Sequence, residues 1–229
     1  ASNPTWANHT GLFQAAGINV KTHPYNDYEN KKLDFDGMLA ALKEVKADDA
    51  VLLHACCHNP SGMDLSKEQW QQIVDVAKQV GFLPVIDMAY QGFGQDLDSD
   101  AYGLRLMADS VEQMIICSSC SKNFGLYRER TGMACVVTAS NEIRRNLQTQ
   151  IQSVARANYS MPPDHGAEIV RIILNDKDLR AEWEKELTDV RNHMVTIREN
   201  LAEAMRKRSN SADYDFIAEH RGMFSLIGI

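Results

Sequence analysis

Short apolar runs alternate with segments of helical periodicity along most of this chain, and that alternation limits the folds it can adopt. Four runs are apolar almost throughout, as expected of strands buried on both faces of a sheet: Val51–Ala55, Leu83–Asp87, Met114–Cys117 and Met133–Val137. Gly17–Val20 is a shorter candidate strand. The strand–helix–strand order predicts an α/β fold, with a mostly parallel sheet and helices on both faces.

Two helices have clear start signals. Ser66 and Gln69 have the spacing of a capping box ahead of an apolar stripe, and Gly81 is a typical stop signal for that helix. Asp36 is expected to cap an earlier helix that ends near Val45. Both helices fall between predicted strands, as an α/β fold requires.

The pattern changes near residue 180. Apolar residues recur every three or four positions from Leu179 to Met205, which predicts one long helix that links domains or lines an interface. Gly222–Ile229 is predicted to be a strand that the sequence cuts short. We therefore assign residues 1–180 to the central part of a large domain. Residues 181–229 are expected to form a linking helix and the beginning of a small α+β domain, and both ends to continue in a longer protein.

The composition argues against several classes of function. Of the 229 residues, 44% are hydrophobic and 24% are charged, as in an ordinary globular protein. The net charge of −7 and the lack of a basic stripe argue against a nucleic-acid partner. No apolar run reaches the roughly 20 residues that span a bilayer, so no membrane partner is expected. Five cysteines, mostly in apolar runs, favour a reducing cytoplasm.

The most informative motif is Ser119–Arg130, which follows one of the predicted strands. At the mouth of a strand, Lys122 can form a Schiff base with a phosphorylated aldehyde. Ser119, Ser121 and Arg130 can then hold the phosphate. This combination indicates pyridoxal phosphate chemistry, although a lone Ser-x-x-Lys would be weak evidence, since most lysines are solvated surface charges.

Two further polar clusters, HACCHNPSG and DMAYQGF, follow other predicted strands. Ligands of parallel α/β sheets bind beyond the carboxyl ends of the strands, so these clusters should meet the lysine motif. Asp87 can keep the pyridine nitrogen of the cofactor protonated. Asn59 and Tyr90 can hydrogen-bond its phenolic oxygen, and Trp6 offers an aromatic surface for stacking.

Five motifs, taken in order, resemble the aspartate/aromatic amino acid aminotransferase family of class I, whose members have the fold type I architecture. The motifs are Pro4–His9, Cys57–Gly62, Asp87–Phe93, Ser119–Arg130 and Arg156–Ser160. The resemblance covers essentially the whole chain. It implies pyridoxal 5'-phosphate as cofactor, and amino acids and 2-oxo acids as substrates. The implied reaction is transamination between aspartate, or an aromatic amino acid, and 2-oxoglutarate, by a ping-pong route through pyridoxamine phosphate.

The resemblance also implies catalytic roles. Lys122 would bind the cofactor and then carry the proton between the substrate and the cofactor. Asp87 would pair with the pyridinium nitrogen, with His9 and His54 behind it in a hydrogen-bond network. Tyr90 would hold the phenolic oxygen and so adjust the pKa of the nitrogen that joins Lys122 to the cofactor.

The remaining implied roles concern binding. Trp6 would stack on the ring and, with Asn59, contact the substrate, while Ser119 and Arg130 would bind the phosphate. Arg156 would reach the neighbouring subunit's site and hold the side-chain carboxylate of dicarboxylic substrates, which implies a homodimer with shared active sites. The family commonly has asparagine where this chain has Met161, beside Arg156.

Alternative interpretations remain open. Proteins of this fold also serve as β-lyases and as effector-sensing modules without catalysis. Cys117 and Cys120 have the Cys-x-x-Cys form of a zinc site that Cys56, Cys57 and His58 could complete, or they could form a redox disulfide. Cys56 and Cys57 are expected to point to opposite faces of a strand, so no metal is expected.

Overall fold

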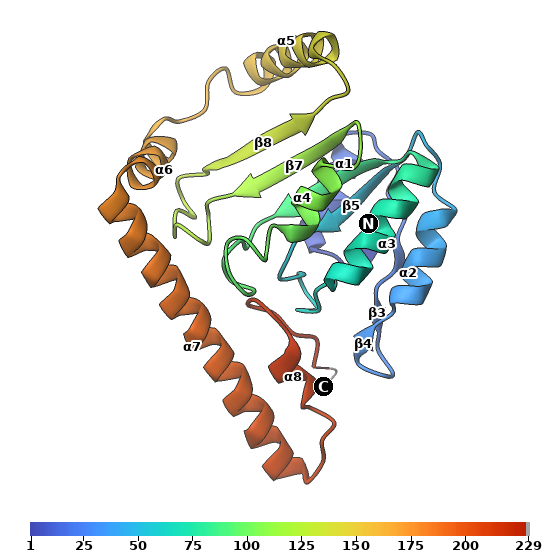
Figure 1. Cartoon of the computed structure of the whole chain (residues 1–229), viewed down its shortest axis with the longest axis vertical. Coiled ribbons are helices and arrows are strands. Elements are labelled where there is room, and N and C mark those ends of the chain that lie inside the picture. The colour runs from blue at the N-terminus through green and yellow to red at the C-terminus, as the bar shows by residue number, and fades with distance from the viewer. Residues whose placement is uncertain (228–229) are drawn as a thin grey trace.

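A four-stranded sheet forms the centre of the computed structural model, which describes residues 1–227 (Figure 1). The strand order is β5–β6–β7–β8, and the first three strands are parallel. Their bounds are β5 Ala50–His54, β6 Leu83–Met88, β7 Met114–Ser119 and β8 Gly132–Val137. The predicted α/β fold with a mostly parallel sheet is confirmed.

β8 runs antiparallel to β7. The loop Cys120–Thr131 that joins them contains no helix, and a parallel return would need a crossover connection, usually a helix. The loop therefore leaves β7 and re-enters the sheet directly beside it, with the Cys120 N–H bonded to the Thr131 carbonyl at 3.0 Å. This loop carries the lysine motif.

Three helices pack in sequence order against one another beside the sheet: α2 Phe35–Lys43, α3 Lys67–Val80 and α4 Tyr102–Ala108. Fully buried side chains from these helices and from β6 share one core: Met38, Ile73, Ile86 and Met107. Burying such side chains is the main source of stability here, at about 1.5–3 kcal/mol each.

The start and end of α3 follow the sequence signals. The Ser66 side chain accepts the Gln69 N–H, and the Gln69 side chain accepts the Ser66 N–H, so the capping box is confirmed. Gly81 ends the helix at φ 83°, a left-handed conformation that glycine adopts without strain. Trp70, one residue after Gln69, is buried against Gly103 of α4.

The expected cap of α2 is wrong by two residues. Asp34, not Asp36, is the N-cap, because its side chain accepts the Gly37 N–H at 3.0 Å. The aspartate sits so close that a Cβ at Gly37 would lie 2.4 Å from its carboxylate. Asp36 lies in the first turn, where it can still interact favourably with the helix dipole.

The expected strand at Gly17–Val20 is also wrong. These residues follow the end of a helix instead: the Ile18 N–H bonds the Phe13 carbonyl, and the Ile18 side chain is exposed. The amino-terminal part of the chain forms short elements, namely β1 Ser2–Asn3, α1 Ala7–Ala15, β2 His23–Pro24, β3 Asn26–Asp27 and β4 Lys32–Leu33. β1 pairs with β2 in parallel, and β3 with β4 antiparallel.

The carboxy-terminal half is helical: α5 Asn141–Asn158, α6 His165–Asn175, α7 Lys177–Ser209 and α8 Phe216–Glu219. The predicted long helix is confirmed as α7, whose 33 residues run along one side of the molecule (Figure 1). α5 lies beyond the β8 edge of the sheet in the same view.

The strand predicted at residues 222–229 is wrong for residues 222–227, and residues 228–229 lie outside the described part of the chain. Arg198 of α7 holds this segment instead. Its guanidinium donates to the carbonyls of Gly222 and Phe224, both at 2.6 Å, and the described residues of the segment pair with no strand.

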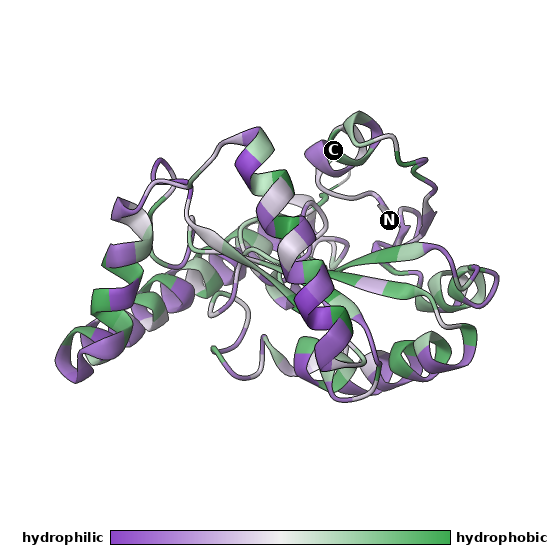
Figure 2. Cartoon of the chain, turned by 90° about the horizontal axis from the view of Figure 1, so that it is seen from above, coloured by the Kyte–Doolittle hydropathy of each residue, from purple (hydrophilic) through white to green (hydrophobic). Residues whose placement is uncertain are grey.

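The helices carry hydrophilic and hydrophobic residues side by side along their lengths (Figure 2). Within residues 1–227, no helix is both long enough and apolar enough to cross a membrane. Helices of this two-sided kind bury one face against a core and present the other to water.

The capping box gives the first test. Ser66→Ala removes the side-chain acceptor for the Gln69 N–H and should lower the free energy of unfolding by about 1 kcal/mol. Ser66→Thr retains the hydroxyl and should stay within about 0.5 kcal/mol of the wild type. Urea unfolding of the cofactor-free protein measures both values. Equal losses in the two variants would show that the cap does not stabilise α3.

Candidate active site

The parallel register of three strands builds one edge of the sheet. His54 of β5 is paired with Asp87 of β6, and Asp87 is paired with Cys117 of β7. The segments that follow these strands carry Asn59, Tyr90 and Lys122, so all three polar clusters predicted from the sequence begin at this edge. It is the carboxyl edge of the parallel strands, where α/β proteins bind ligands.

Asp87 is held by a histidine from α1. The Nε2 atom of His9 lies 3.1 Å from the Asp87 carboxylate, and the Asp87 side chain retains 20% of its exposure. The Trp6 ring stands edge-on to His9, with centroids 5.2 Å apart, and is 38% exposed. The structure thus gathers Trp6, His9 and Asp87, which the sequence analysis had assigned to one site.

Thr5 joins the two predicted histidines. Its hydroxyl is hydrogen-bonded to His9 Nδ1 at 2.8 Å and to His54 Nε2 at 3.2 Å, so a chain of polar contacts runs from Asp87 to His54. Burial lowers the pKa of His54 to about 4, although the charge of Asp87 opposes the shift. His54 is therefore neutral near pH 7. The sequence analysis did not single out Thr5, although it lies in the Pro4–His9 motif.

His58 has a structural role. Its ring stacks on Tyr25 with centroids 3.9 Å apart, and its two nitrogens are hydrogen-bonded to Ser2 at 2.9 Å and to Ser61 at 2.8 Å. Burial lowers the pKa of His58 well below its usual range. With both nitrogens occupied, His58 fixes the loop that follows β5 and is not placed to bind a metal.

Asp64 shapes the same loop. Its two carboxylate oxygens accept the backbone N–H groups of Cys57 at 2.8 Å and His58 at 3.0 Å, and burial raises the pKa of Asp64 to about 6. Asn59 directly follows His58 in this loop. Burial raises the pKa of Tyr90, and the Asn59 side chain opposes that rise. The sequence analysis missed Asp64, because its role depends on how the loop folds.

Lys122 lies beside Tyr90. The Lys122 Nζ atom is 4.9 Å from the centroid of the Tyr90 ring, within the range of a cation–π contact. The lysine begins a turn in which its carbonyl accepts the Gly125 N–H at 3.0 Å. The Asn123 side chain also donates to the Gln91 carbonyl at 3.3 Å. This bond directly connects the lysine loop, Cys120–Thr131, to the tyrosine loop, residues 89–101 between β6 and α4.

The three residues predicted to hold a phosphate share the loop around Lys122. Ser119 ends β7, and its hydroxyl accepts the Ser121 N–H at 3.1 Å. Arg130 has an exposed side chain that donates to the Tyr127 carbonyl at 2.9 Å. Arg156 lies apart from this group, exposed in the last turn of α5.

The structure does not assemble the zinc site considered above. Cys117 and Cys120 are free thiols, so the disulfide between them is also absent. In the described residues, the group of three possible metal ligands whose atoms all lie within 4.8 Å of one another is Cys56, Cys57 and Asp100. Cys56 and Cys57 follow the end of β5 and bring their sulfurs together, so the expectation that they point to opposite faces of a strand is wrong.

Asp100, the third member of that group, already accepts three backbone N–H groups. Their donors are Gly92, Gly94 and Gln95, at 2.8 to 2.9 Å. These bonds account for its place in the fold, since a buried carboxylate needs such donors.

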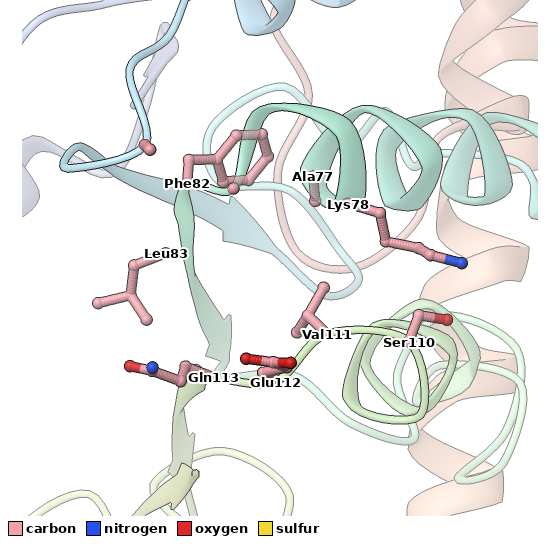
Figure 3. Close-up of a pocket in the computed structure, with 10 residues that line it drawn as sticks. Ala77, Lys78, Phe82, Leu83, Ser110, Val111, Glu112 and Gln113 are labelled. Atoms are coloured by element: carbon pink, nitrogen blue, oxygen red, sulfur yellow. The ribbon is translucent and has the colours of Figure 1, made fainter. Parts of the chain in front are cut away.

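A cavity of about 520 Å³ lies at the opposite edge of the sheet (Figure 3). Leu83, the first residue of β6, and Gln113, which precedes β7, line it together with Lys78 and Glu112. The carboxyl ends of the strands are at the other edge. The cavity is therefore separate from the cluster around Lys122.

The whole chain, residues 1–229, matches the model of the family described as aminotransferase class I and II. The chain therefore belongs to the class I and II aminotransferases. It is 47% identical over 227 residues to the aromatic-amino-acid aminotransferase of Paracoccus denitrificans and 44% identical over 228 residues to the aspartate aminotransferase of Escherichia coli. It spans 58% of the length of each of these relatives.

Solved structures agree with the family assignment. An aromatic amino acid aminotransferase with 3-indolepropionic acid superposes with a TM-score of 0.98 at 46% identity, over all of this chain and 59% of that one. The Burkholderia pseudomallei aromatic-amino-acid aminotransferase covalently bound to pyridoxal phosphate has a TM-score of 0.97 at 42% identity, over all of this chain and 57% of that one. Both support the predicted fold class.

His54 gives a pH test. The folded pKa of His54 is about 4 and its ordinary value is 6.5, so between these values the unfolded chain binds a proton that the folded chain does not. Stability should therefore rise with pH from about 4 to 6.5 and fall as the solution is acidified, with a slope of up to about 1.4 kcal/mol per pH unit from this histidine.

His54→Gln should make this slope shallower, and His193→Gln, at an exposed position of α7, is the control. Urea unfolding of the cofactor-free protein at several pH values measures the slopes. A slope in His54→Gln as steep as in the wild type would contradict the assignment.

Proposed function

We propose that this chain carries the cofactor-binding centre of an aminotransferase that uses pyridoxal 5'-phosphate. The whole protein would exchange amino groups between aspartate, or an aromatic amino acid, and 2-oxoglutarate. The observation that carries the proposal is the convergence of Asp87, Tyr90 and Lys122 at the carboxyl edge of the sheet. The relatives named aspartate and aromatic-amino-acid aminotransferase support it.

The side chains at this edge fit the cofactor. Lys122 supplies a primary amine beside an aromatic hydroxyl, and Asp87 supplies a partly exposed carboxylate that His9 holds in place. A carboxylate in that position can pair with a protonated ring nitrogen. When bound, pyridoxal phosphate would take the amino group from one substrate and give it to the next, and we therefore expect ping-pong kinetics.

The residues of this chain would then bind, orient and move a proton. Tyr90 and Asn59 would together orient the phenolic oxygen of the ring. Lys122 would carry the proton at its Nζ atom, and Trp6 would cover one face of the ring. Ser119, Ser121 and Arg130 would bind the phosphate, because hydroxyls and a guanidinium in one loop suit its oxygens.

Arg156 would serve the active site of a partner subunit in a homodimer. No residue of α5 is buried, and the helix exposes three apolar side chains, Ile143, Ile151 and Val154. An apolar surface of this kind on an outer helix suits contact with a second subunit. The arginine would then hold the side-chain carboxylate of a dicarboxylic substrate.

The domain division follows from the same proposal. Residues 1–180 would belong to the large cofactor domain, and residues 181–229 would lead into a small domain that the whole protein completes. The reducing cytoplasm is the proposed location, supported by five cysteines that are all free. Activity belongs to the whole protein, since the chain spans 58% of its relatives' length.

Replacement of the lysine tests the function. In the full-length protein, Lys122→Ala removes the amine that would bind the cofactor and move the proton, so kcat for transamination should fall by at least about 10²-fold. Borohydride reduction with pyridoxal phosphate, followed by mass spectrometry, should label Lys122 in the wild type. Lys78→Ala, which changes the cavity at the other edge, is the control and should retain activity. Normal turnover by Lys122→Ala would refute the proposal.

Replacement of the arginine tests substrate binding. Arg156→Ala should lower kcat/KM for aspartate by about 10²-fold, because a charged hydrogen-bonding partner of the carboxylate is lost, while phenylalanine should lose less than about threefold. Arg145→Ala, on the same exposed helix, should change neither value. Steady-state kinetics with both amino acids measure the effect. Equal losses for the two substrates would exclude this role for Arg156.

A further inference from the structure

One residue of α7 contacts the segment immediately after the lysine. The Trp183 Nε1–H donates to the Asn123 carbonyl at 2.7 Å, and the Trp183 ring stacks on Phe124 with centroids 4.3 Å apart and planes 9° from parallel. Asn123 and Phe124 directly follow Lys122 in the sequence. A helix that begins 55 residues later, at Lys177, thus holds the backbone that carries the lysine.

Leu187 and Arg191, one and two turns further along α7, hold the tyrosine loop. Leu187 is buried against Gly92, where an added Cβ would lie 2.4 Å from the Leu187 Cδ2 atom. Arg191 donates to the Gly92 carbonyl at 3.0 Å. Trp183, Leu187 and Arg191 are spaced by four residues, so they lie along one face of α7. Gly92 is two residues from Tyr90.

The two loops held by α7 are also joined to each other. The Asn123 side chain donates to the Gln91 carbonyl at 3.3 Å, and the Lys122 amine lies 4.9 Å from the Tyr90 ring. The lysine loop, the tyrosine loop and α7 therefore each contact the other two. A shift in any one of them moves the Lys122 Nζ atom relative to the Tyr90 hydroxyl.

We propose that Trp183 is a positioning residue for Lys122. Its hydrogen bond and stacked ring fix the backbone after the lysine, so that the amine stays beside Tyr90. The inference rests on the proposed function and adds a residue distant in sequence from every motif. Misplacement of a reacting group by about 1 Å can cost up to about 10²-fold in rate, so a contact that fixes the lysine backbone matters for turnover.

Trp70 provides a comparison, because it packs between two helices. Trp70 is 3% exposed and packs against Gly103 between α3 and α4. Trp183, in contrast, joins its indole N–H to a backbone carbonyl of the lysine loop. A comparison of variants at the two tryptophans therefore distinguishes an effect on packing from an effect on the position of Lys122.

The experiment uses the full-length holoprotein with Trp183→Phe, which keeps an aromatic ring but removes the donor, and Trp70→Phe as the control. Three quantities are measured: kcat and KM, the pH midpoint of the visible absorbance of the bound cofactor, and the melting temperature. Trp183→Phe should lower kcat about tenfold with KM within about twofold, and should move the absorbance midpoint by at least about 0.5 pH unit. Trp70→Phe should lower the melting temperature but leave the midpoint in place.

Amide hydrogen exchange in the cofactor-free protein gives a readout that does not depend on activity. Loss of one hydrogen bond of about 1 kcal/mol should speed exchange in residues 120–128 about fivefold in Trp183→Phe, and Trp70→Phe should leave this segment unchanged. Phe124→Leu, which removes the stacked ring partner but keeps the hydrogen bond, should shift the absorbance midpoint less than Trp183→Phe does. Phe124→Leu is decisive if Trp183→Phe does not fold, since an unchanged midpoint would then overturn the inference.

Wild-type kcat and an unchanged midpoint in a folded Trp183→Phe would overturn the positioning role, whatever its melting temperature. Unchanged exchange in residues 120–128 would also overturn it. A wild-type protein that neither binds the cofactor at Lys122 nor transaminates would instead overturn the proposed function. The exchange experiment tells these two failures apart, because it needs no cofactor.

Discussion

Parallel pairing of β5, β6 and β7 is the constraint on which the rest of this structure depends. The register that sets His54 beside Asp87, and Asp87 beside Cys117, makes the three following segments start at one edge. Neighbouring strands are only about 4.8 Å apart, so side chains from these segments meet without any long loop. The antiparallel return of β8 then anchors the lysine loop at both of its ends. The pairing of the strands therefore determines where the site lies, and the side chains determine what it can bind.

Burial determines how the polar residues behind this edge act. Burial lowers the pKa of both His54 and His58, so these histidines contribute hydrogen bonds and not positive charge near neutral pH. Thr5 passes the hydrogen-bond chain from His54 to His9, and His9 orients the Asp87 carboxylate. Neither His54 nor His58 places a positive charge near the carboxylate at neutral pH. An anion so placed suits a cationic ring nitrogen.

Features that local signals specify could be predicted, and features that depend on tertiary contacts could not. The apolar runs of β5 to β7 and the capping box of α3 are local, and both are confirmed. Gly17–Val20 has strand-like residues but pairs with no strand, and the Gly222 carbonyl is taken by Arg198. Motif residues such as Lys122 could be named from the sequence. Thr5, Asp64 and Trp183 could not, because a long-range or loop contact gives each its role.

Tyr90 shows how far the site depends on the remainder of the chain. Lys122 lies over its ring, and Phe224 stands edge-on to it with centroids 6.3 Å apart. Arg198 of α7 holds the segment that carries Phe224, and the same helix holds the lysine loop through Trp183. The helix α7 thus contacts two segments that touch Tyr90: the lysine loop and the segment around Phe224. The position of the tyrosine hydroxyl is therefore set jointly by the sheet edge and by α7, which the sequence analysis assigned to two different domains.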